Sequence, residues 1–201
     1  MKITLLDSGA NNVASVERAL QRLGAESQRA TAPECIANAE ALLLPGVGHF
    51  ETLIRVLDEF KLREPLVDAI RGGVPFLGIC LGLQTLYDGS DEAPEVTGLQ
   101  LLPGRVRALP AIAKLPHMGW NRLLIKQKSR LLEGIDADAY FYFAHTYAAI
   151  EQREEAVAAC SYGTEFVAVV EKENMYAVQF HPEKSGEAGA QVLQNFLRLC
   201  A

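Results

Sequence analysis

Long apolar runs are absent from this sequence of 201 residues. No stretch approaches the roughly 18 consecutive apolar residues that a membrane-spanning helix needs. Apart from Met1, the first segment reaches the acidic Asp7 after only three apolar residues, which does not resemble a secretory signal peptide. We therefore expect a cytoplasmic protein that works without a membrane.

Cysteine and histidine are scarce and scattered. The four cysteines, Cys35, Cys80, Cys160 and Cys200, show no C-x-x-C spacing, so we expect free cytosolic thiols rather than disulfides. The four histidines offer no pair with the spacing of metal ligands on one element. The sequence also contains neither a phosphate-binding P-loop nor a G-x-G-x-x-G segment. We expect no metal and no cofactor.

Positive charge is in deficit. Lys and Arg number 19 against 25 Asp and Glu, which gives a net charge of −6. A broad surface for nucleic acid or an anionic membrane is therefore not expected. Hydrophobic residues make up 49% and charged residues 22%, as in ordinary globular proteins. Since there is no repeat, low-complexity tract or linker, we predict one domain over residues 1–201, with a core that needs no disulfides.

The first half alternates between short apolar runs, typical of buried strands, and amphipathic stripes, typical of helices. The clearest stripe joins Phe50, Leu53, Ile54, Leu57 and Phe60. This alternation of strands and helices predicts a mainly parallel sheet with helices on both faces. The predicted strands lie at 2–7, 41–44 and 75–79, the helices at 13–23, 50–60, before 72 and at 81–87, and a turn at 8–11.

The second half is richer in strands. Short runs of β-branched, aromatic and aliphatic residues are separated by turn residues, and the last segment, 187–199, carries a helical stripe. The acidic stretch 88–95 is expected to be a solvated loop, in which one carboxylate could bind an amino group. The whole pattern predicts an α/β fold with a strand-rich second half. The predicted strands lie at 105–109, 120–125, 140–143, 156–161, 166–171 and 175–180.

One cysteine stands in a pattern that carries chemistry. Cys80 lies between Gly78 and Gly82, directly after a predicted buried strand and before a predicted helix. This arrangement is typical of a sharp strand-to-helix turn that lifts a nucleophile clear of the backbone. The start of the following helix would also favour the thiolate. A buried structural cysteine at a tight turn is an equally good interpretation of this pattern alone.

Two further segments are compatible with cysteine chemistry. His181 and Glu183 flank a proline after a predicted strand, so the carboxylate can hold the imidazole as a base and its orienting partner. The loop 45–48, Pro-Gly-Val-Gly, follows another strand and suits backbone N–H groups that meet an oxyanion. Taken singly, the first is also typical of a hydrogen-bonded histidine beside a solvated glutamate, and the second of an ordinary turn. Together with Cys80, however, they favour nucleophilic hydrolysis.

The other histidines and the tryptophan are less informative. His49 fits a helix start as well as a site residue, and His117 and His145 are expected in loops. Trp120 is the only tryptophan, and we expect it near a partner interface because large amphipathic rings anchor such surfaces. The alternative is a half-buried ring that serves packing.

Together these segments resemble the class I, or triad, glutamine amidotransferases. The resemblance rests on Pro45–Gly48, Gly78–Gln84 and Gln179–Ser185, in this order, and covers about residues 3–198. Pro116–Asn121 is similar to a segment of one group in the family, the glutaminase subunits that supply ammonia to a (β/α)₈-barrel cyclase in histidine biosynthesis. The resemblance implies a single flavodoxin-like α/β domain in a heterodimer with that cyclase.

The resemblance also implies roles for single residues. Cys80 would be the nucleophile, His181 the general base and acid, and Glu183 its orienting partner. Leu81 and Val47 would supply the oxyanion N–H groups. The residues implied for the glutamine pocket are Gly48, Gln84, Glu92, Thr146 and Tyr147, with Glu92 meeting the substrate ammonium. The family pattern differs at Ser8, His49, Thr146 and Ala177, none of which belongs to the triad.

The implied activity is hydrolysis of L-glutamine, with ammonia passed to the cyclase that makes imidazole glycerol phosphate and an aminoimidazole carboxamide ribotide. One alternative is a stand-alone cysteine hydrolase acting on another amide, and another is a non-catalytic subunit that only gates the cyclase. A third is a glutaminase that serves a different partner, such as the synthase for pyridoxal phosphate, which Pro116–Asn121 disfavours. Ammonia release and a covalent adduct on Cys80 distinguish the first two from the implied activity.

Overall fold

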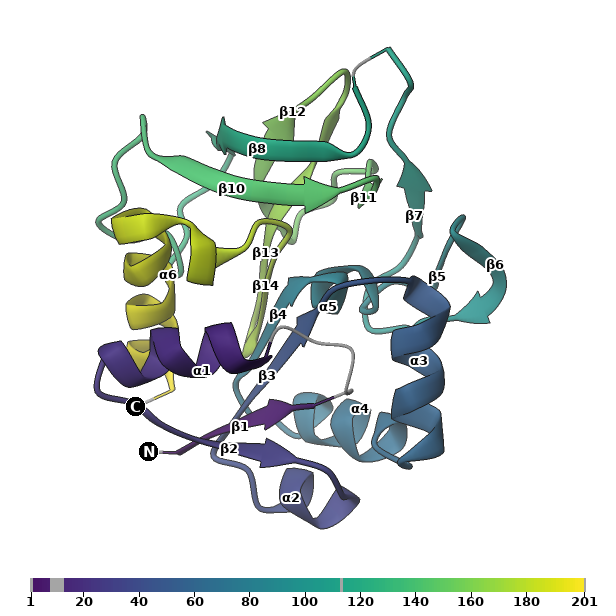
Figure 1. Ribbon diagram of the computed structural model, residues 1–201, viewed down its shortest axis with the longest axis vertical. Helices are drawn as coiled ribbons and strands as arrows, with labels where there is room; N and C mark the ends of the chain where they lie inside the picture. Colours follow the sequence, from purple (N-terminus) through teal and green to yellow (C-terminus); the bar gives the residue numbers. More distant parts are fainter. Residues whose placement is uncertain (1, 8–12, 113, 201) are drawn as a thin grey trace.

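The computed structural model of the protein describes residues 2–7, 13–112 and 114–200 (Figure 1). The predicted turn at 8–11, which includes Ser8, lies outside the described residues. A sheet of eight strands runs through the molecule; the first five in spatial order are parallel and the last three antiparallel. The strands are, in this order, β2 (Glu26–Ala30), β1 (Lys2–Leu6), β3 (Ala41–Gly46), β4 (Phe76–Cys80), β14 (Met175–Val178), β13 (Glu165–Lys172), β12 (Ala156–Ser161) and β9 (Leu124–Ile125).

Helices cover both faces of the parallel strands, as predicted (Figure 1). On β3, Leu43 belongs to the apolar cluster that contains α1 (Val13–Arg22) and α6 (Gly186–Leu199). Its neighbours Leu42 and Leu44 belong to the cluster on the other face. This alternation follows from the two-residue period of a strand, and a continuous apolar run therefore serves both layers. The helices that contribute to the second cluster are α2 (Pro33–Ala37), α3 (Phe50–Glu59), α4 (Arg63–Arg71) and the short α5 (Leu81–Gln84).

Up to the end of α5 at residue 84, the described residues contain one strand and one helix more than predicted. Strand β2 extends the sheet beyond β1, and α2 connects it to β3. The sequence of β2 is Glu-Ser-Gln-Arg-Ala with only Ala30 buried, so its hydrophobic pattern is too weak to indicate a strand. Polar residues are tolerated there because the strand lies at the edge of the sheet. The predicted helix 81–87 is also too long, since α5 covers only Leu81–Gln84.

Two smaller sheets contain the remaining strands. β8 (His117–Arg122) and β10 (Tyr140–His145) form an antiparallel ribbon. The prediction of one strand at 120–125 is wrong, because that segment is divided between β8 and β9, which belong to different sheets. The prediction of a loop at 88–95 is also wrong. That segment forms strands in a sheet of order β11 (Tyr147–Ala149), β7 (Arg105–Ala108), β5 (Gly89–Ser90) and β6 (Ala93–Thr97).

The carboxyl ends of the parallel strands meet at one edge of the central sheet, where open α/β sheets usually bind ligands. β3 ends at Gly46, β4 ends at Cys80 and β14 ends at Val178, and β4 lies between the other two strands. The three segments that carry chemistry follow these strand ends. The sheet topology therefore brings them together although they lie far apart in the sequence.

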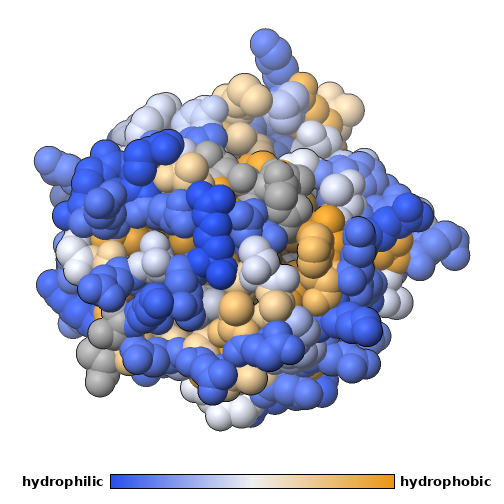
Figure 2. All heavy atoms as spheres, turned by 60° about the horizontal axis from the view of Figure 1, so that its bottom comes forward, coloured by the Kyte–Doolittle hydropathy of each residue, from blue (hydrophilic) through white to orange (hydrophobic). Residues whose placement is uncertain are grey.

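Figure 2 shows the face of the molecule that lies at the bottom of Figure 1, near β2 and α2. Hydrophilic side chains cover most of this face, and apolar surface is confined to small patches between them. Among the described residues, no helix has both the length and the apolar character to cross a lipid bilayer. Among the described residues, most of the exposed large apolar side chains lie on β8, β9 and β10: Met118, Trp120, Leu124, Ile125 and Tyr140. Strands β8 and β10 lie near the top of Figure 1.

Candidate active site

Cys80 is held at the predicted sharp turn between β4 and α5. Its backbone has φ +54° and ψ −106°, a conformation that residues other than glycine rarely adopt. A Cβ on Gly78 would lie 2.8 Å from the Gly82 carbonyl oxygen, and a Cβ on Gly82 would lie 2.0 Å from the Leu44 carbonyl oxygen. Both positions therefore require glycine. Since α5 has only four residues, its dipole adds little to the stabilisation of a thiolate, contrary to our expectation.

His181 and Glu183 are paired, as their spacing predicts. The His181 Nδ1 lies 2.9 Å from Glu183 Oε1, and both side chains are buried. The His181 backbone is fixed as well: its N–H donates to the Tyr142 carbonyl at 2.8 Å, and Ser185 Oγ donates to its carbonyl at 2.6 Å. Burial alone would lower the pKa of His181, but the Cys80 sulfur and the Glu183 carboxylate raise it to about 10. The imidazole can therefore hold a proton that it takes from the Cys80 thiol.

A cavity of about 290 Å³ opens at these strand ends. Cys80 and His181 both line it, and so does every other site residue named from the sequence except Glu183, which is bonded to Nδ1 of His181. The volume suits a small molecule. The lining residues are Val47, Gly48, Cys80, Leu81, Gln84, Glu92, Pro116, Met118, Ala144, His145, Thr146, Tyr147, His181 and Lys184.

The loop before α3 and the first residue of this helix position Gly48 and the Glu92 carboxylate at the cavity. Gly48 has φ +95°, and no atom lies within 4 Å of the place of its Cβ, so backbone conformation rather than space requires glycine. His49 is a helix-start residue, because its Nδ1 accepts a hydrogen bond from the Glu51 N–H at 3.3 Å. The Phe50 N–H donates to Glu92 Oε2 at 2.8 Å. This bond holds the Glu92 carboxylate at the wall of the cavity.

Two buried histidines beside the cavity contact each other, and no pattern in the sequence predicts this contact. His117 Nδ1 lies 3.1 Å from His145 Nε2, and the His117 ring stacks on Phe143 and Tyr162. The histidines belong to β8 and β10, not to loops as expected, and strand pairing places them opposite each other. Burial lowers the pKa of His117 to about 4 and that of His145 to about 3. Both imidazoles are therefore neutral at pH 7.

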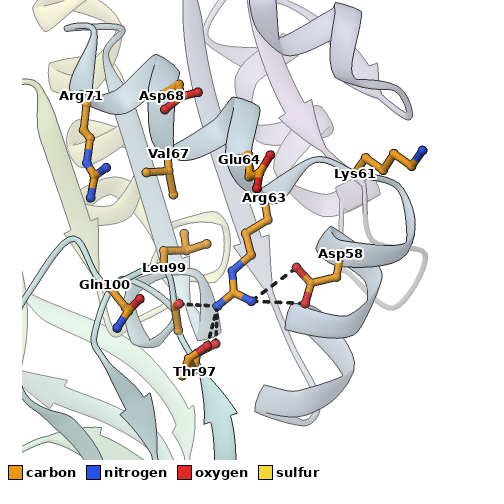
Figure 3. Close-up of a pocket in the computed structure, with 11 residues that line it drawn as sticks. Asp58, Lys61, Arg63, Glu64, Val67, Asp68, Arg71, Thr97, Leu99 and Gln100 are labelled. Carbon is orange, nitrogen blue, oxygen red and sulfur yellow. Dashed lines mark hydrogen bonds and ion pairs between the residues drawn. The ribbon is translucent and has the colours of Figure 1, made fainter.

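A larger cavity, of about 830 Å³, lies beside α4 and the end of β6 (Figure 3). The Arg63 guanidinium donates there to the Asp58 carboxylate and to the backbone carbonyl groups of Thr97 and Gly98. The guanidinium of Arg63 is therefore already engaged in hydrogen bonds to neighbouring groups of the protein. Among the described residues that line this cavity there is no cysteine or histidine, so it lacks the cysteine–histidine pair that the smaller cavity offers. The smaller cavity is the better candidate for an active site.

A comparison with known protein families agrees with the arrangement of Cys80, His181 and Glu183 at the cavity. The profile of the family described as "Glutamine amidotransferase class-I" matches residues 4–200, nearly the whole chain. The chain belongs to the class-I glutamine amidotransferases. The resemblance that its motifs show is therefore confirmed. Membership of this family agrees with the expectation that Cys80, at the strained turn, is the nucleophile.

Several named relatives are similar in sequence to this class-I amidotransferase along nearly its whole length. It is 48% identical over 197 residues to "Imidazole glycerol phosphate synthase subunit HisH" of Methanothermobacter thermautotrophicus, covering 98% of each chain. It is 43% identical over 200 residues to "Imidazole glycerol phosphate synthase hisHF, chloroplastic" of Arabidopsis thaliana, covering 97% of this chain and 34% of that protein. A solved structure described as "Crystal structure of glutamine amidotransferase" has a TM-score of 0.78 at 21% identity and 98% coverage of both chains, which supports the fold.

Proposed function

We propose that this class-I amidotransferase is the glutaminase subunit of an imidazole glycerol phosphate synthase. It hydrolyses L-glutamine to glutamate and ammonia and delivers the ammonia to a (β/α)₈-barrel cyclase, which makes imidazole glycerol phosphate and aminoimidazole carboxamide ribotide. The observation that carries the proposal is Cys80, held at a strained turn in one cavity with the buried His181–Glu183 pair. Identity to a HisH subunit over nearly the full length supports the choice of partner. The four free cysteines fit the reducing cytoplasm, where we place the enzyme.

Catalysis begins when the Cys80 thiol gives its proton to His181, which leaves a thiolate and an imidazolium. The thiolate attacks the side-chain carboxamide carbon of glutamine and forms a tetrahedral intermediate. His181 returns the proton to the leaving nitrogen, so the C–N bond breaks, ammonia departs and a thioester remains on Cys80. His181 then takes a proton from water, hydroxide adds to the thioester, and the C–S bond breaks to release glutamate. Glu183 holds Nδ1 of the imidazole throughout.

Backbone groups and one carboxylate bind the substrate. The N–H of Leu81 and an N–H of the glycine loop at Val47 meet the negative oxygen of each tetrahedral intermediate. Glu92 meets the ammonium group of glutamine. The backbones of Thr146–Tyr147 and of Gly48 hold the carboxylate and carboxamide ends, and Gln84 completes the pocket that the cavity offers.

An apolar surface beside the cavity suits the cyclase. In the ribbon of β8 and β10, Met118 is paired with Ala144 and Trp120 with Tyr142. Met118 is 64% exposed and Trp120 55% exposed, and Met118 and Ala144 also line the cavity. Ammonia released into water at pH 7 is mostly protonated and is then no nucleophile. The acceptor enzyme must therefore seal the cavity mouth, and we place the cyclase against this ribbon.

Docking of the cyclase should shift the fluorescence of Trp120 to shorter wavelength, because the partner removes water from the exposed indole. In the free subunit the ring contacts Tyr142 edge-on, with ring centroids 5.9 Å apart. The measurement is an emission spectrum during titration with the cyclase. In Trp120→Phe, the matched control, the shift should vanish. An unchanged wild-type spectrum, with binding shown by size-exclusion chromatography, would mean that Trp120 serves packing only.

Glu183→Gln should cost less activity than His181→Ala. The glutamine keeps an oxygen for Nδ1 of the imidazole and loses only the negative charge, whereas alanine removes the group that moves protons in both half-reactions. We expect the loss of kcat for Glu183→Gln to be roughly 10- to 100-fold smaller than for His181→Ala. Steady-state kinetics of both variants in complex with the cyclase measure this difference. An equal or larger loss for Glu183→Gln would mean that the two roles are misassigned.

Ammonia release from L-glutamine by the protein assembled with a cyclase subunit tests the proposed function. Formation of imidazole glycerol phosphate from glutamine, without added ammonium salt, requires both hydrolysis and transfer. A stand-alone hydrolase would support neither reaction. A non-catalytic subunit would show no covalent adduct on Cys80 with a glutamine-mimicking electrophile. Either result would contradict the proposal.

A further inference from the structure

One backbone carbonyl sets the orientation of the polar side chains around the nucleophile. The Tyr147 carbonyl oxygen can only accept hydrogen bonds, and it accepts from Gln84 Nε2 at 2.7 Å and lies 2.9 Å from His145 Nδ1. Gln84 must therefore direct its amide nitrogen at this carbonyl, and His145 must carry its proton on Nδ1. With that tautomer His145 Nε2 accepts, so His117 Nδ1 donates to it.

The same reasoning extends from Gln84 to the sulfur of Cys80. Gln84 Nε2 donates its second N–H to Gln179 Oε1 at 3.1 Å. The carboxamide of Gln179 is thereby oriented with its oxygen toward Gln84 and its nitrogen toward the active site. There Gln179 Nε2 lies 3.5 Å from Cys80 Sγ. Because an amide nitrogen offers only N–H groups, Gln179 donates to the sulfur.

The fold holds Gln179 in this place. It directly follows β14, where Val178 is paired with Ile79 of β4, so Gln179 comes beside Cys80. Its backbone N–H donates to the Ala168 carbonyl at 2.9 Å, which ties it to β13. The residue is fully buried. A buried carboxamide is costly unless its hydrogen bonds are made, and an apolar residue would serve packing alone at lower cost.

We propose that Gln179 is a further catalytic residue of this active site, whose side-chain N–H stabilises the Cys80 thiolate. The hydrogen bond is weak while the sulfur is a neutral thiol and becomes charge-assisted once the proton has moved to His181. It weakens again after attack, because the sulfur of the thioester is neutral. Gln179 therefore acts on formation of the nucleophile. This inference deepens the proposed function and rests on Cys80 as the nucleophile.

Alkylation of Cys80 by iodoacetamide, followed by mass spectrometry of the peptide that carries it, tests this role in the full chain without glutamine or cyclase. Gln179→Met has a side chain of similar length that cannot donate. We expect the pH of half-maximal alkylation to rise by about one unit in this variant. The rate at the high-pH plateau should rise about threefold, because a more basic thiolate is more nucleophilic. Disruption of the site would lower the plateau instead.

Measurements of kcat and KM also distinguish the loss of thiolate stabilisation from a general disruption of the site. In complex with the cyclase at pH 7, Gln179→Met should lower kcat for glutamine about tenfold, since about a tenth of the thiolate remains, and leave KM within about twofold. Should this variant fail to fold, Gln179→Glu takes its place. There the alkylation midpoint should rise by more than one unit above that of the wild type, because a carboxylate faces the thiolate.

Asn195→Leu is the matched control, because Asn195 is another buried carboxamide that donates to two carbonyl groups, those of Leu131 and Glu133. It should lower the melting temperature and keep the wild-type alkylation profile. An unshifted midpoint in a folded Gln179 variant, or an equal shift in Asn195→Leu, would overturn the role of Gln179. A wild-type Cys80 that resists alkylation at every pH would instead overturn its role as nucleophile and with it the proposed function.

Discussion

Cys80→Ala is expected to lower kcat for glutamine by about 10⁴-fold or more in complex with the cyclase. The sulfur is the only atom of the protein that bonds covalently to substrate in the proposed mechanism. Among the described residues that line the cavity there is no second thiol. The substitution removes a single small side-chain group at the turn, so the subunit should still fold and bind. Ammonia release from glutamine is the measurement.

Two controls make this result specific. The cyclase in complex with Cys80→Ala should run at the wild-type rate on added ammonium salt, which shows that the cyclase reaction itself is unaffected. Size-exclusion chromatography should show that the variant still binds the cyclase. Cys160→Ala should keep full glutaminase activity, because Cys160 is buried in β12 outside the cavity and burial raises the pKa of its thiol to about 12. Residual activity of Cys80→Ala within tenfold of wild type would remove Cys80 as the nucleophile.

The cyclase with its ribotide ligand is expected to accelerate glutamine hydrolysis at least tenfold over the isolated subunit. One proposed oxyanion donor, the Leu81 N–H, directly follows the turn at Cys80. The other belongs to the glycine loop, which is only partly held. A Cβ on Gly46 would lie 2.6 Å from Leu81 Cβ, whereas nothing lies within 4 Å of the place of a Gly48 Cβ. The peptide between Val47 and Gly48 can therefore reorient at little steric cost.

The size of the effect follows from the missing donor. Loss of one oxyanion N–H costs about 2.7–4 kcal/mol of transition-state stabilisation, a factor of about 10²–10³ in rate. If the loop at rest turns a carbonyl toward the cavity, the triad hydrolyses glutamine only slowly. Ammonia is then not released before the cyclase can use it. The cyclase ligand can reverse this only through contacts that differ between the two loop orientations.

Turnover numbers for glutamine with the subunit alone, with the cyclase, and with the cyclase plus ligand measure the activation. We expect the large increase in the last step, because the ligand and not the docking surface selects the loop orientation. If the isolated subunit already matches the liganded complex, gating by the glycine loop is wrong. The roles of Cys80 and His181 would survive that result.

The elements predicted correctly from the sequence are those whose physical cause is local. The turn at Cys80 needs glycine two residues before and two residues after it, and the steric reason lies within this short segment and β3. The pairing of His181 with Glu183 needs only a two-residue spacing. Helix α3 was indicated by apolar residues repeating every three to four positions, the period of its buried face.

The elements that were missed depend on partners far away in the chain. β2 is polar because it lies at the edge of the sheet, so no hydrophobic pattern marks it. The segment 120–125 was predicted as one strand, yet β8 pairs with β10 while β9 pairs with β12. Strand propensity does not state the partner, because pairing is decided by contacts across sheets.

By itself, the sequence determined the α/β class, the family and the two segments that hold Cys80 and the His181–Glu183 pair. Only the tertiary structure decided that they share one cavity, that His145 in its wall meets His117, and that Gln179 directs its N–H at the sulfur. The physical reason is that spacing along the chain specifies local backbone geometry, whereas the direction of a buried side-chain amide is decided by the acceptor it meets. That acceptor chain starts here at the Tyr147 carbonyl, which only the folded sheet brings within hydrogen-bonding distance of Gln84.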